Sequence, residues 1–205
     1  MRLLTLILLV TSLCSTLTLA ASNTSGLPSC VVCHGAGVQG NSIVRAPNLS
    51  ILPTWYITAQ LEAYQHNWRG ADASLADAKD MRAVALALSD KEREQALKFI
   101  GAVTPQSAKP SLLGDRSHGQ QLFSTCSACH GDMAQGNEAL KAPPLAGQND
   151  WYLVSQLKAY QANHRGYAKE DSNGNMMRSS VSLLGNEQDI LDVASYLTSI
   201  EISKE

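Results

Sequence analysis

The chain reads Cys30-Val31-Val32-Cys33-His34 near its start, and the pattern returns as Cys126-Ser127-Ala128-Cys129-His130. Cys-x-x-Cys-His is the pattern through which c-type haem is attached to a protein. The spacing suits this chemistry because two thiols add to the two vinyl groups on one porphyrin edge, and the next side chain, an imidazole, then lies under the iron. The sequence therefore predicts two covalently attached haem c groups, with His34 and His130 as iron ligands.

Four cysteines and two histidines admit three other interpretations, and each explains less of the pattern. A zinc ribbon places its cysteine pairs about 15–20 residues apart, whereas 92 residues lie between Cys33 and Cys126. A redox-active dithiol does not require histidine in the next position, and the paired disulfides of an exported protein leave both histidines unexplained. Haem attachment accounts for all six residues.

A repeat with a period of 96 residues extends well beyond these two signatures. Identical residues stand 96 positions apart, without a gap, in the pairs Gly40/Gly136, Pro47/Pro143, Leu49/Leu145, Trp55/Trp151, Tyr56/Tyr152, Gln60/Gln156, Tyr64/Tyr160, Arg69/Arg165, Gly70/Gly166, Met81/Met177 and Arg82/Arg178. We therefore expect two duplicated domains, residues 21–104 and 114–205. Pro105 and Pro110 interrupt the helical pattern between them, which predicts a linker over residues 105–113.

A helix after each haem signature is indicated by apolar residues at spacings of three and four. Over residues 55–68 these are Ile57, Leu61, Tyr64 and Trp68, and over residues 151–164 they are Val154, Leu157 and Tyr160. We expect both helices to end at the glycine of an Arg-Gly pair, Gly70 in the first half and Gly166 in the second.

A second helix is marked further along each half. Ser89 to Glu92 has the form of a capping box and predicts a helix running to Ile100. Its counterpart begins at Asn186 and carries on one face Ile190, Val193, Ala194 and Leu197. No alternating strand pattern occurs, so the expected fold class is all-α, with two tandem helical domains. Aromatic residues are only 5% of the chain, and we expect the haem to supply apolar mass to each small core.

The sixth ligand of each iron separates electron carriers from haem enzymes, which need an open site. Met81 and Met177 are the only methionines related by the 96-residue offset, and a soft thioether stabilises ferrous iron. We expect both in a polar loop between two helices. Met176 is an alternative to Met177, although its counterpart is Asp80. Surface or packing roles are expected for the histidines without a histidine counterpart, His66, His118 and His164.

Taken in order, these motifs resemble the dihaem cytochrome c4 family over essentially the whole chain after residue 20. The resemblance rests on the tandem Cys-x-x-Cys-His signatures, the Trp-Tyr helices, the Met-Arg pairs, and the segments Pro47-Asn48-Leu49 and Pro143-Pro144-Leu145. It implies two class I cytochrome c domains that carry single electrons in the periplasm. The iron ligands that it implies are His34 with Met81 in one domain and His130 with Met177 in the other.

The same resemblance implies two further features of the sites. The carbonyls of Pro47 and Pro143 would accept the free N–H of the proximal imidazoles, a bond that fixes each ring and tunes its basicity. The two haems would lie close enough to exchange electrons across the domain interface.

Residues 1–20 have the composition of a secretory signal peptide. Arg2 precedes an apolar run from Leu3 to Val10, and small residues lead up to Ala20. We expect cleavage near Ala20 and a periplasmic protein. A membrane anchor is the alternative, but polar residues interrupt the run before the roughly 18 apolar residues that a span needs. A lipid attached at Cys14 fits less well still.

The two domains differ just before their haem signatures. Gly119 and Phe123 resemble the first helix of the family, which packs against the last helix, whereas their counterparts are Asn23 and Leu27 and Pro28 follows at once. We therefore expect the N-terminal helix of the first domain to be short or absent.

Charge excludes one class of partner and leaves another open. The net charge is −2 with no long basic run, which argues against nucleic acid. Removing residues 1–20 takes away Arg2 and no acid, leaving 15 basic and 18 acidic residues. Residues 105–205 hold eight basic and eleven acidic side chains, against seven of each in residues 21–104. A basic partner surface near the second domain and a simple solvated acidic face explain this excess equally well.

The sequence supports three hypotheses of function. In the first, single electrons pass between a respiratory donor, a quinol-oxidising complex or a dehydrogenase, and a terminal oxidase or reductase, with any membrane association made through these partners. The second is a haem subunit held permanently by a catalytic partner such as a flavin-containing dehydrogenase. The third, a dihaem peroxidase, is disfavoured by methionine at both matched positions, and no paired carboxylates or nucleophile constellation indicates another catalytic site. We therefore expect an electron-transfer protein, not an enzyme.

Overall fold

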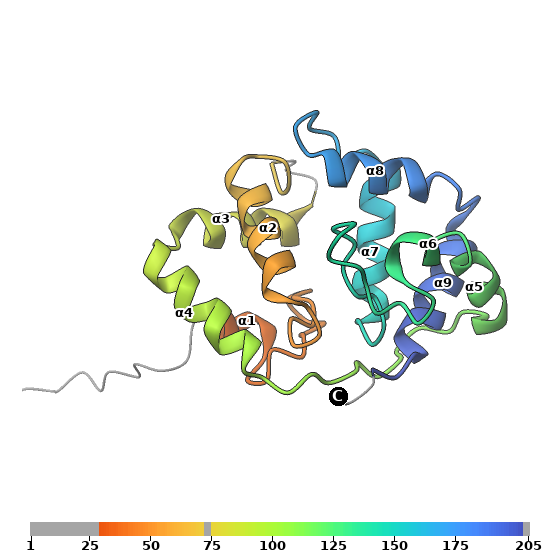
Figure 1. The fold of residues 1–205 in the computed structure, drawn as a ribbon, viewed down its shortest axis with the longest axis horizontal. Helices are drawn as coiled ribbons and strands as arrows, with labels where there is room; N and C mark the ends of the chain where they lie inside the picture. The colour runs from red at the N-terminus through yellow and green to blue at the C-terminus, as the bar shows by residue number, and fades with distance from the viewer. Residues whose placement is uncertain (1–28, 72–74, 203–205) are drawn as a thin grey trace, which may run out of the picture.

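The computed structural model describes residues 29–71 and 75–202, and the regular elements there are helices (Figure 1). The first four are α1 (Cys30–His34), α2 (Thr54–Gln65), α3 (Ala76–Ala87) and α4 (Asp90–Gly101). The next five are α5 (Arg116–Phe123), α6 (Ser127–His130), α7 (Asp150–Gln161), α8 (Ser172–Val181) and α9 (Glu187–Ser199). Within these ranges the β pairing is limited to two isolated bridges, Asn41 with Ala46 and Asn137 with Ala142. The predicted all-α fold is confirmed.

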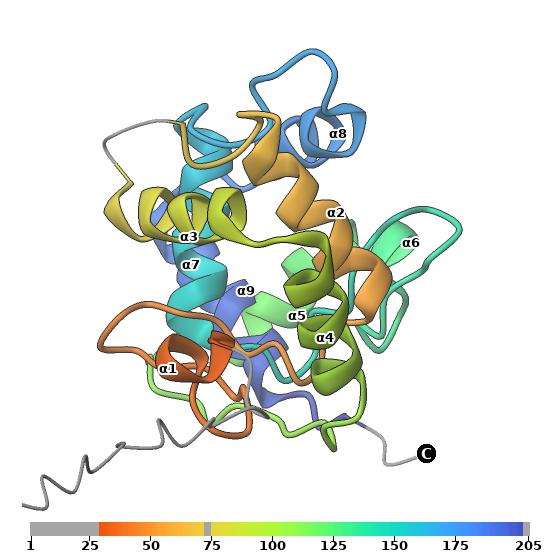
Figure 2. The same cartoon turned by 90° about the vertical axis from the view of Figure 1, so that its left-hand side faces the viewer.

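The helices form two units that stand side by side. Helices α1 to α4 make one unit and α5 to α9 the other, with α2 and α7 on the facing sides (Figures 1 and 2). In the described ranges, no helix combines the length and the apolar composition needed to cross a membrane. The predicted signal peptide and the predicted absence of an N-terminal helix before Cys30 concern residues 1–28, which lie outside the described residues.

The sequence repeat is also a repeat of backbone conformation. Six of the described residues other than glycine have positive φ, and they form three pairs 96 positions apart: Val38 and Ala134, Arg45 and Lys141, Asn67 and Asn163. The two isolated bridges match in the same way. Because positive φ is uncommon away from glycine, three matched pairs indicate that both units fold the loops between their helices alike.

Helices α2 and α7 end earlier than their sequences predict. They were expected to end at Gly70 and Gly166, but their last residues are Gln65 and Gln161. The cause is an asparagine two residues later in each half, Asn67 or Asn163, with φ of 60°. Asparagine adopts this left-handed conformation more readily than most residues and so ends a helix. The Arg-Gly pair that follows belongs to the loop.

The two methionines predicted as ligands lie on helices, which corrects their expected position in polar loops. Met81 is part of α3 and Met177 is part of α8. Alanine is the best helix former and recurs through α3. The α8 sequence is less favourable, but Asp171 caps its first turn by accepting a hydrogen bond from the backbone N–H of Gly174 at 2.8 Å. This capping residue is visible in the sequence, and its effect outweighs the unfavourable polar composition of α8.

The two helices marked by capping residues are confirmed. Ser89 and Glu92 form a reciprocal capping box at the start of α4, and Asn186 caps α9 by accepting from the backbone N–H of Asp189 at 3.0 Å. The predicted apolar face of α9 is buried in the core of the second unit at Ile190, Val193, Ala194 and Leu197.

Helix α5 crosses α9 at close range through a glycine. A Cβ atom at Gly119 would lie 2.1 Å from the carbonyl oxygen of Asp192, so only glycine lets the two backbones approach this closely. The contact continues where the rings of Phe123 and Tyr196 pack with centroids 5.7 Å apart. The second domain therefore has the helix contact that Gly119 and Phe123 suggested.

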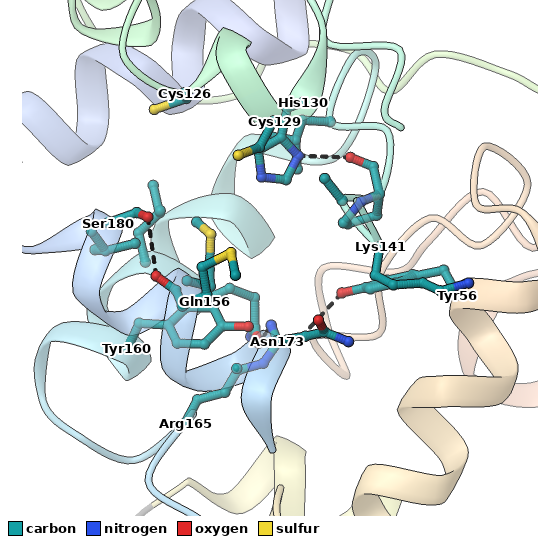
Figure 3. A pocket seen from close by; sticks show the side chains of 18 of the residues that line it. Tyr56, Cys126, Cys129, His130, Lys141, Gln156, Tyr160, Arg165, Asn173 and Ser180 are labelled. Atoms are coloured by element: carbon teal, nitrogen blue, oxygen red, sulfur yellow. Dashed lines mark hydrogen bonds between the residues drawn. The ribbon is translucent and has the colours of Figure 1, made fainter. Parts of the chain in front are cut away.

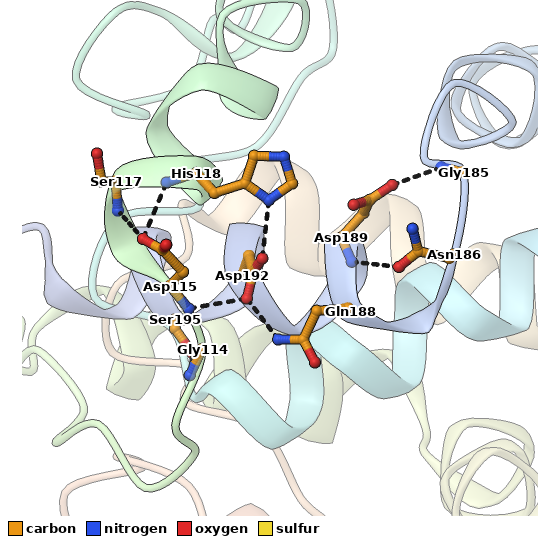
Figure 4. Close-up of polar contacts among 10 residues, drawn as sticks. All are labelled: Gly114, Asp115, Ser117, His118, Gly185, Asn186, Gln188, Asp189, Asp192 and Ser195. Atoms are coloured by element: carbon orange, nitrogen blue, oxygen red, sulfur yellow. Dashed lines mark hydrogen bonds and ion pairs between the residues drawn. The ribbon is translucent and has the colours of Figure 1, made fainter.

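A buried carboxylate on α9 holds the start of α5 (Figure 4). Asp192 accepts from the backbone N–H of Asp115 at 2.8 Å and from Gln188 Nε2 at 2.7 Å, and it pairs with His118 Nδ1 at 2.8 Å. Burial alone raises the pKa of Asp192, but these hydrogen bonds outweigh it and lower that pKa. The bond to the carboxylate raises the pKa of His118 in turn.

We expect this pair to make stability fall as the pH rises through neutrality. Because the pKa of His118 in the folded chain lies above its ordinary value of 6.5, the folded state holds the proton more tightly than the unfolded state. The stabilisation is complete below that ordinary value and is lost as the pH passes the raised folded-state pKa. Thermal unfolding of the haem-loaded protein between about pH 5 and about pH 9 measures this slope. His118→Gln should flatten the slope and Ser117→Ala, on the same helix, should retain it; equal slopes in both variants would contradict the assignment.

The segment between α4 and α5 is bonded to both units. On one side, the backbone N–H of Gln106 donates to Ser50 Oγ at 3.2 Å. On the other, the buried Asp150 at the start of α7 accepts from Ser111 Oγ at 2.6 Å and from the backbone N–H of Leu112 at 2.7 Å. This connection is therefore an ordered part of the structure.

Candidate haem sites

Two short helices carry the cysteines and histidines of the signatures. Helix α1 spans Cys30–His34, and α6 spans Ser127–His130 with Cys126 directly before it. A glycine with positive φ, Gly35 or Gly131, follows each histidine and turns the chain away. The structure joins none of the four signature cysteines in a disulfide, so both sulfur atoms of each signature can form thioether bonds to a haem.

Both signature histidines are buried and held by a proline carbonyl. The Nδ1 atom of His34 lies 2.8 Å from the carbonyl oxygen of Pro47, and the Nδ1 atom of His130 lies 2.8 Å from that of Pro143. Burial lowers the pKa of each imidazole more than the carbonyl raises it, which favours the neutral ring. A neutral ring that donates through Nδ1 leaves the lone pair of Nε2 free to bind a metal.

The loop that brings each proline back to its histidine depends on glycine. The backbone N–H of Gly40 donates to the carbonyl of His34 at 2.9 Å, and Gly136 makes the same bond to His130 at 2.8 Å. Both have positive φ, and a Cβ at Gly136 would lie 2.5 Å from the nitrogen of Pro144. A side chain here would push the proline segment away from the imidazole.

A cavity of about 370 Å³ opens beside His130 in the second domain. Figure 3 shows Cys126, Cys129 and His130 on one side of it and Tyr160 and Arg165 on the other. A volume of this size lies within the range of small-molecule and cofactor sites, about 300–1,000 Å³. The cysteines and the imidazole that the sequence predicts for one haem are thus brought together at one cavity.

Two adjacent methionines also line this cavity, but they differ in exposure. Met176 is 60% exposed, whereas Met177 is partly buried and packs against the core of the second domain. Met81 packs in the same way against the core of the first domain. The burial of Met177 and Met81 distinguishes them from Met176 as candidate ligands.

A reciprocal cluster of polar side chains joins the two domains next to the cavity. Arg69 donates to Gln60 of its own domain at 2.7 Å, and across the interface to Tyr152 at 3.0 Å and Gln156 at 2.8 Å. Arg165 repeats this arrangement in the opposite direction: it donates to Gln156 at 2.8 Å, Tyr56 at 3.1 Å and Gln60 at 2.8 Å. Each arginine therefore ties its own domain to the other.

The two buried arginines fit a site for an anionic group. Arg69 and Arg165 are 6% and 7% exposed, and the hydrogen-bond partners found for them in the described chain are amides and phenols, not carboxylates. The Nε atom of Arg69 is buried without a partner. Buried cations that lack a counter-charge are costly, and the propionates of a haem would supply one. Together with the thiols, imidazole and thioether, these arginines show that the residues present fit haem.

Sequence reasoning identified the cysteines and histidines but missed the polar cluster. A signal was available, because Arg69, Gln60, Tyr56 and their partners are all repeated at the 96-residue offset. The repeat alone does not indicate burial, because arginine and glutamine on a helix surface are ordinarily solvated.

Known proteins share both the sequence and the arrangement of this chain. A cytochrome c family profile matches residues 117–201. Cytochrome c-554(548) from Halomonas halodenitrificans is 38% identical over 88 residues, which cover 43% of this chain and 99% of that protein. A thiosulfate dehydrogenase electron acceptor from Stutzerimonas stutzeri is 26% identical over 183 residues, covering 84% of this chain and 79% of that protein. The cytochrome c4 structure from Acidithiobacillus ferrooxidans matches with a TM-score of 0.67 and 26% identity, over 83% of this chain and 98% of that one.

Helical units of this kind, each with a Cys-x-x-Cys-His signature and a buried histidine bonded to a proline carbonyl, are class I cytochrome c domains in tandem. The domains carry covalently attached haem c. The chain belongs to the dihaem cytochrome c4 family. It is an electron-transfer protein rather than an enzyme.

Proposed function

We propose that the chain carries single electrons in the periplasm between a respiratory donor, a quinol-oxidising complex or a dehydrogenase, and a terminal oxidase or reductase. One observation supports this most strongly: the buried His130, fixed by the Pro143 carbonyl, lines the same cavity as Met177. If this imidazole and this thioether both held the iron, they would leave no place on it for a substrate, as an electron carrier requires.

The proposed ligand sets follow the repeat. In the first domain Cys30 and Cys33 attach the haem, and His34 and Met81 bind its iron. In the second domain the corresponding residues are Cys126, Cys129, His130 and Met177. When bound, each haem iron takes up and releases one electron. The proline carbonyls at 47 and 143 hold the imidazoles in one tautomer and orientation, and the helical methionines favour the ferrous state.

We also propose the boundaries of the mature protein. The leader is residues 1–20, cleaved near Ala20, the domains are residues 21–104 and 114–205, and the linker is residues 105–113. The leader is supported by its composition.

A dehydrogenase is a specific candidate for the donor. The relative from Stutzerimonas stutzeri is named as the electron acceptor of thiosulfate dehydrogenase and aligns along most of this chain. The same relative supports the alternative that this chain is the haem subunit of a permanent complex. Purification from the native host decides between them: a free monomer supports the mobile carrier, and co-purification with a dehydrogenase at constant stoichiometry supports the subunit.

An optical redox titration of the haem-loaded protein tests the proposed function. We expect two haems per chain, both low-spin, both with the weak long-wavelength band of methionine-bound ferric iron, and both with positive potentials. A high-spin haem that binds peroxide would overturn the carrier assignment for its domain.

Replacing Met177 distinguishes it from its neighbour as the iron ligand. Met177→Ala should remove the methionine band from one of the two haems, lower the potential of that haem and let its iron bind cyanide or carbon monoxide, because the sixth position opens. Met176→Ala should leave both haems unchanged, since Met176 is mostly exposed. The opposite result in these two variants would make Met176 the ligand.

A further inference from the structure

One peptide unit of the first domain is bonded to both the signature histidine and the other domain. The carbonyl of Pro47 accepts from His34 Nδ1 at 2.8 Å. The N–H of the same peptide unit, that of Asn48, donates to Gln148 Oε1 at 3.0 Å and to Asn149 Oδ1 at 2.9 Å. Both acceptors belong to the second domain. A single amide therefore connects the imidazole of one domain with two side-chain oxygens of the other.

This connection is buried and firmly held. Asn48 is 0% exposed and Gln148 is 2% exposed. Gln148 Nε2 donates back to the Asn48 carbonyl at 2.9 Å, and the Gln148 carbonyl accepts from Thr198 Oγ1 of α9 at 2.7 Å. Asn48 Nδ2 donates in addition to the Gln106 carbonyl at 2.7 Å. The side-chain nitrogen and the backbone carbonyl of Gln148 are thus both held, which fixes the orientation of its side-chain oxygen toward the Asn48 N–H.

The second domain has no equivalent of this connection. The peptide unit that accepts from His130 there lies between Pro143 and Pro144, and a proline nitrogen carries no hydrogen to donate. The position equivalent to Gln148 in the first domain is Leu52, whose side chain has no hydrogen-bonding group. The 96-residue repeat is thus broken at both the donor and the acceptor of this bond. Any effect of the bond on a reduction potential therefore falls on the first-domain haem alone.

A hydrogen bond donated by an amide N–H polarises the carbonyl of the same unit and strengthens the bond that the carbonyl accepts. A stronger bond at Nδ1 makes the imidazole a better electron donor to the metal at its other nitrogen, which favours ferric over ferrous iron. We propose that Gln148 and Asn149 are positioning residues that lower the reduction potential of the first-domain haem through the Pro47–Asn48 peptide unit. The inference rests on the proposed ligation of that haem by His34.

Two variants test this in the haem-loaded protein, each removing one acceptor. Gln148→Leu introduces the residue found in the first domain, and Asn149→Ala leaves α7 intact because the Asn149 side chain makes no capping bond. Each should raise the potential of the first-domain haem, shifting its ratio of reduced to oxidised iron about twofold to threefold at a fixed applied potential, and leave the second haem unmoved. The proton resonance of His34 Nδ1–H in the reduced protein should move upfield, and that of His130 should stay. Met81→His, which changes the potential of the first domain, identifies its titration step.

The matched control is Tyr167→Phe, which removes a different bond across the interface, from Tyr167 to the carbonyl of Asn67. It should leave the first-domain potential unchanged. A shift equal to that of Gln148→Leu would show that loosened docking is responsible and would overturn the inference, as would no shift, or equal shifts of both haems, in the two test variants. The proposed function fails separately, through missing haem or a missing methionine band in the unmodified protein.

Discussion

Replacing Arg165 with leucine is expected to loosen the two domains and to lower the potential of the haem proposed for the second domain. Arg165 is buried, and it donates across the interface to Tyr56 at 3.1 Å and Gln60 at 2.8 Å, while its guanidinium lies 4.6 Å from the centre of the Tyr160 ring. Loss of two charged hydrogen bonds across the interface weakens docking by about 3 kcal/mol. Arg165 lines the cavity beside His130, so removing its positive charge would disfavour an added electron there and lower the potential of the second-domain haem.

Small-angle scattering and redox titration of the haem-loaded Arg165→Leu variant measure these two effects. Arg93→Leu is the control, because Arg93 forms an exposed ion pair with Asp90 at 2.7 Å, and such pairs contribute little. It should change neither the radius of gyration nor the potentials. A compact Arg165→Leu variant with unaltered potentials would show that the arginine cluster neither joins the domains nor faces the haem charges.

Replacing Gly119 with alanine should destabilise the second domain more than any surface change. The added Cβ would lie 2.1 Å from the Asp192 carbonyl oxygen, 2.5 Å from its carbon and 2.9 Å from Tyr196 Cβ. Two of these atoms are backbone, so relief requires α5 and α9 to separate. We expect a loss of about 3 kcal/mol in the free energy of unfolding, at the upper end of the usual cost of overpacking.

Gly101→Ala, at the end of α4, is the matched control for this substitution. Its new Cβ would have Thr54 Cγ2 as its nearest neighbour, at 3.3 Å, a side-chain methyl group that can give way. Alanine is also the better helix former, so we expect stability within about 1 kcal/mol of the parent protein. Chemical denaturation of both haem-loaded variants provides the comparison, and equal stabilities would mean that the α5–α9 contact relaxes freely.

The sequence predicts what is local and misses what is made between distant segments. The Cys-x-x-Cys-His signatures, the Ser89 capping box and the apolar face of α9 are each encoded within a few residues, and each was identified. The Arg-Gly pair wrongly predicts the ends of α2 and α7, because each helix is ended earlier by an asparagine in the left-handed conformation. The expectation of polar loops around the two methionines is wrong, since both lie on helices and Asp171 caps the helix that contains Met177.

The contacts between the domains differ in how far the sequence could predict them. The Arg69 and Arg165 cluster is repeated with the 96-residue period, so a search of the repeat for buried polar pairs would have found it. The bond between Asn48 and Gln148 joins residues 100 positions apart and exists only where the repeat is broken. No periodicity or spacing marks such a pair, because it arises from how two complete domains meet.

The ordered connection between α4 and α5 has a consequence for how strongly the domains must attract each other. Because the backbone between the domains is bonded at Gln106 to one and at Ser111 and Leu112 to the other, each domain sees its partner at an effective concentration of about millimolar or higher. Contacts that would be too weak to hold two separate proteins together at cellular levels therefore keep these domains paired. Electron exchange between the two proposed haems would then be a first-order process whose rate does not depend on dilution. The same domains produced as separate chains would exchange electrons only as fast as they collide.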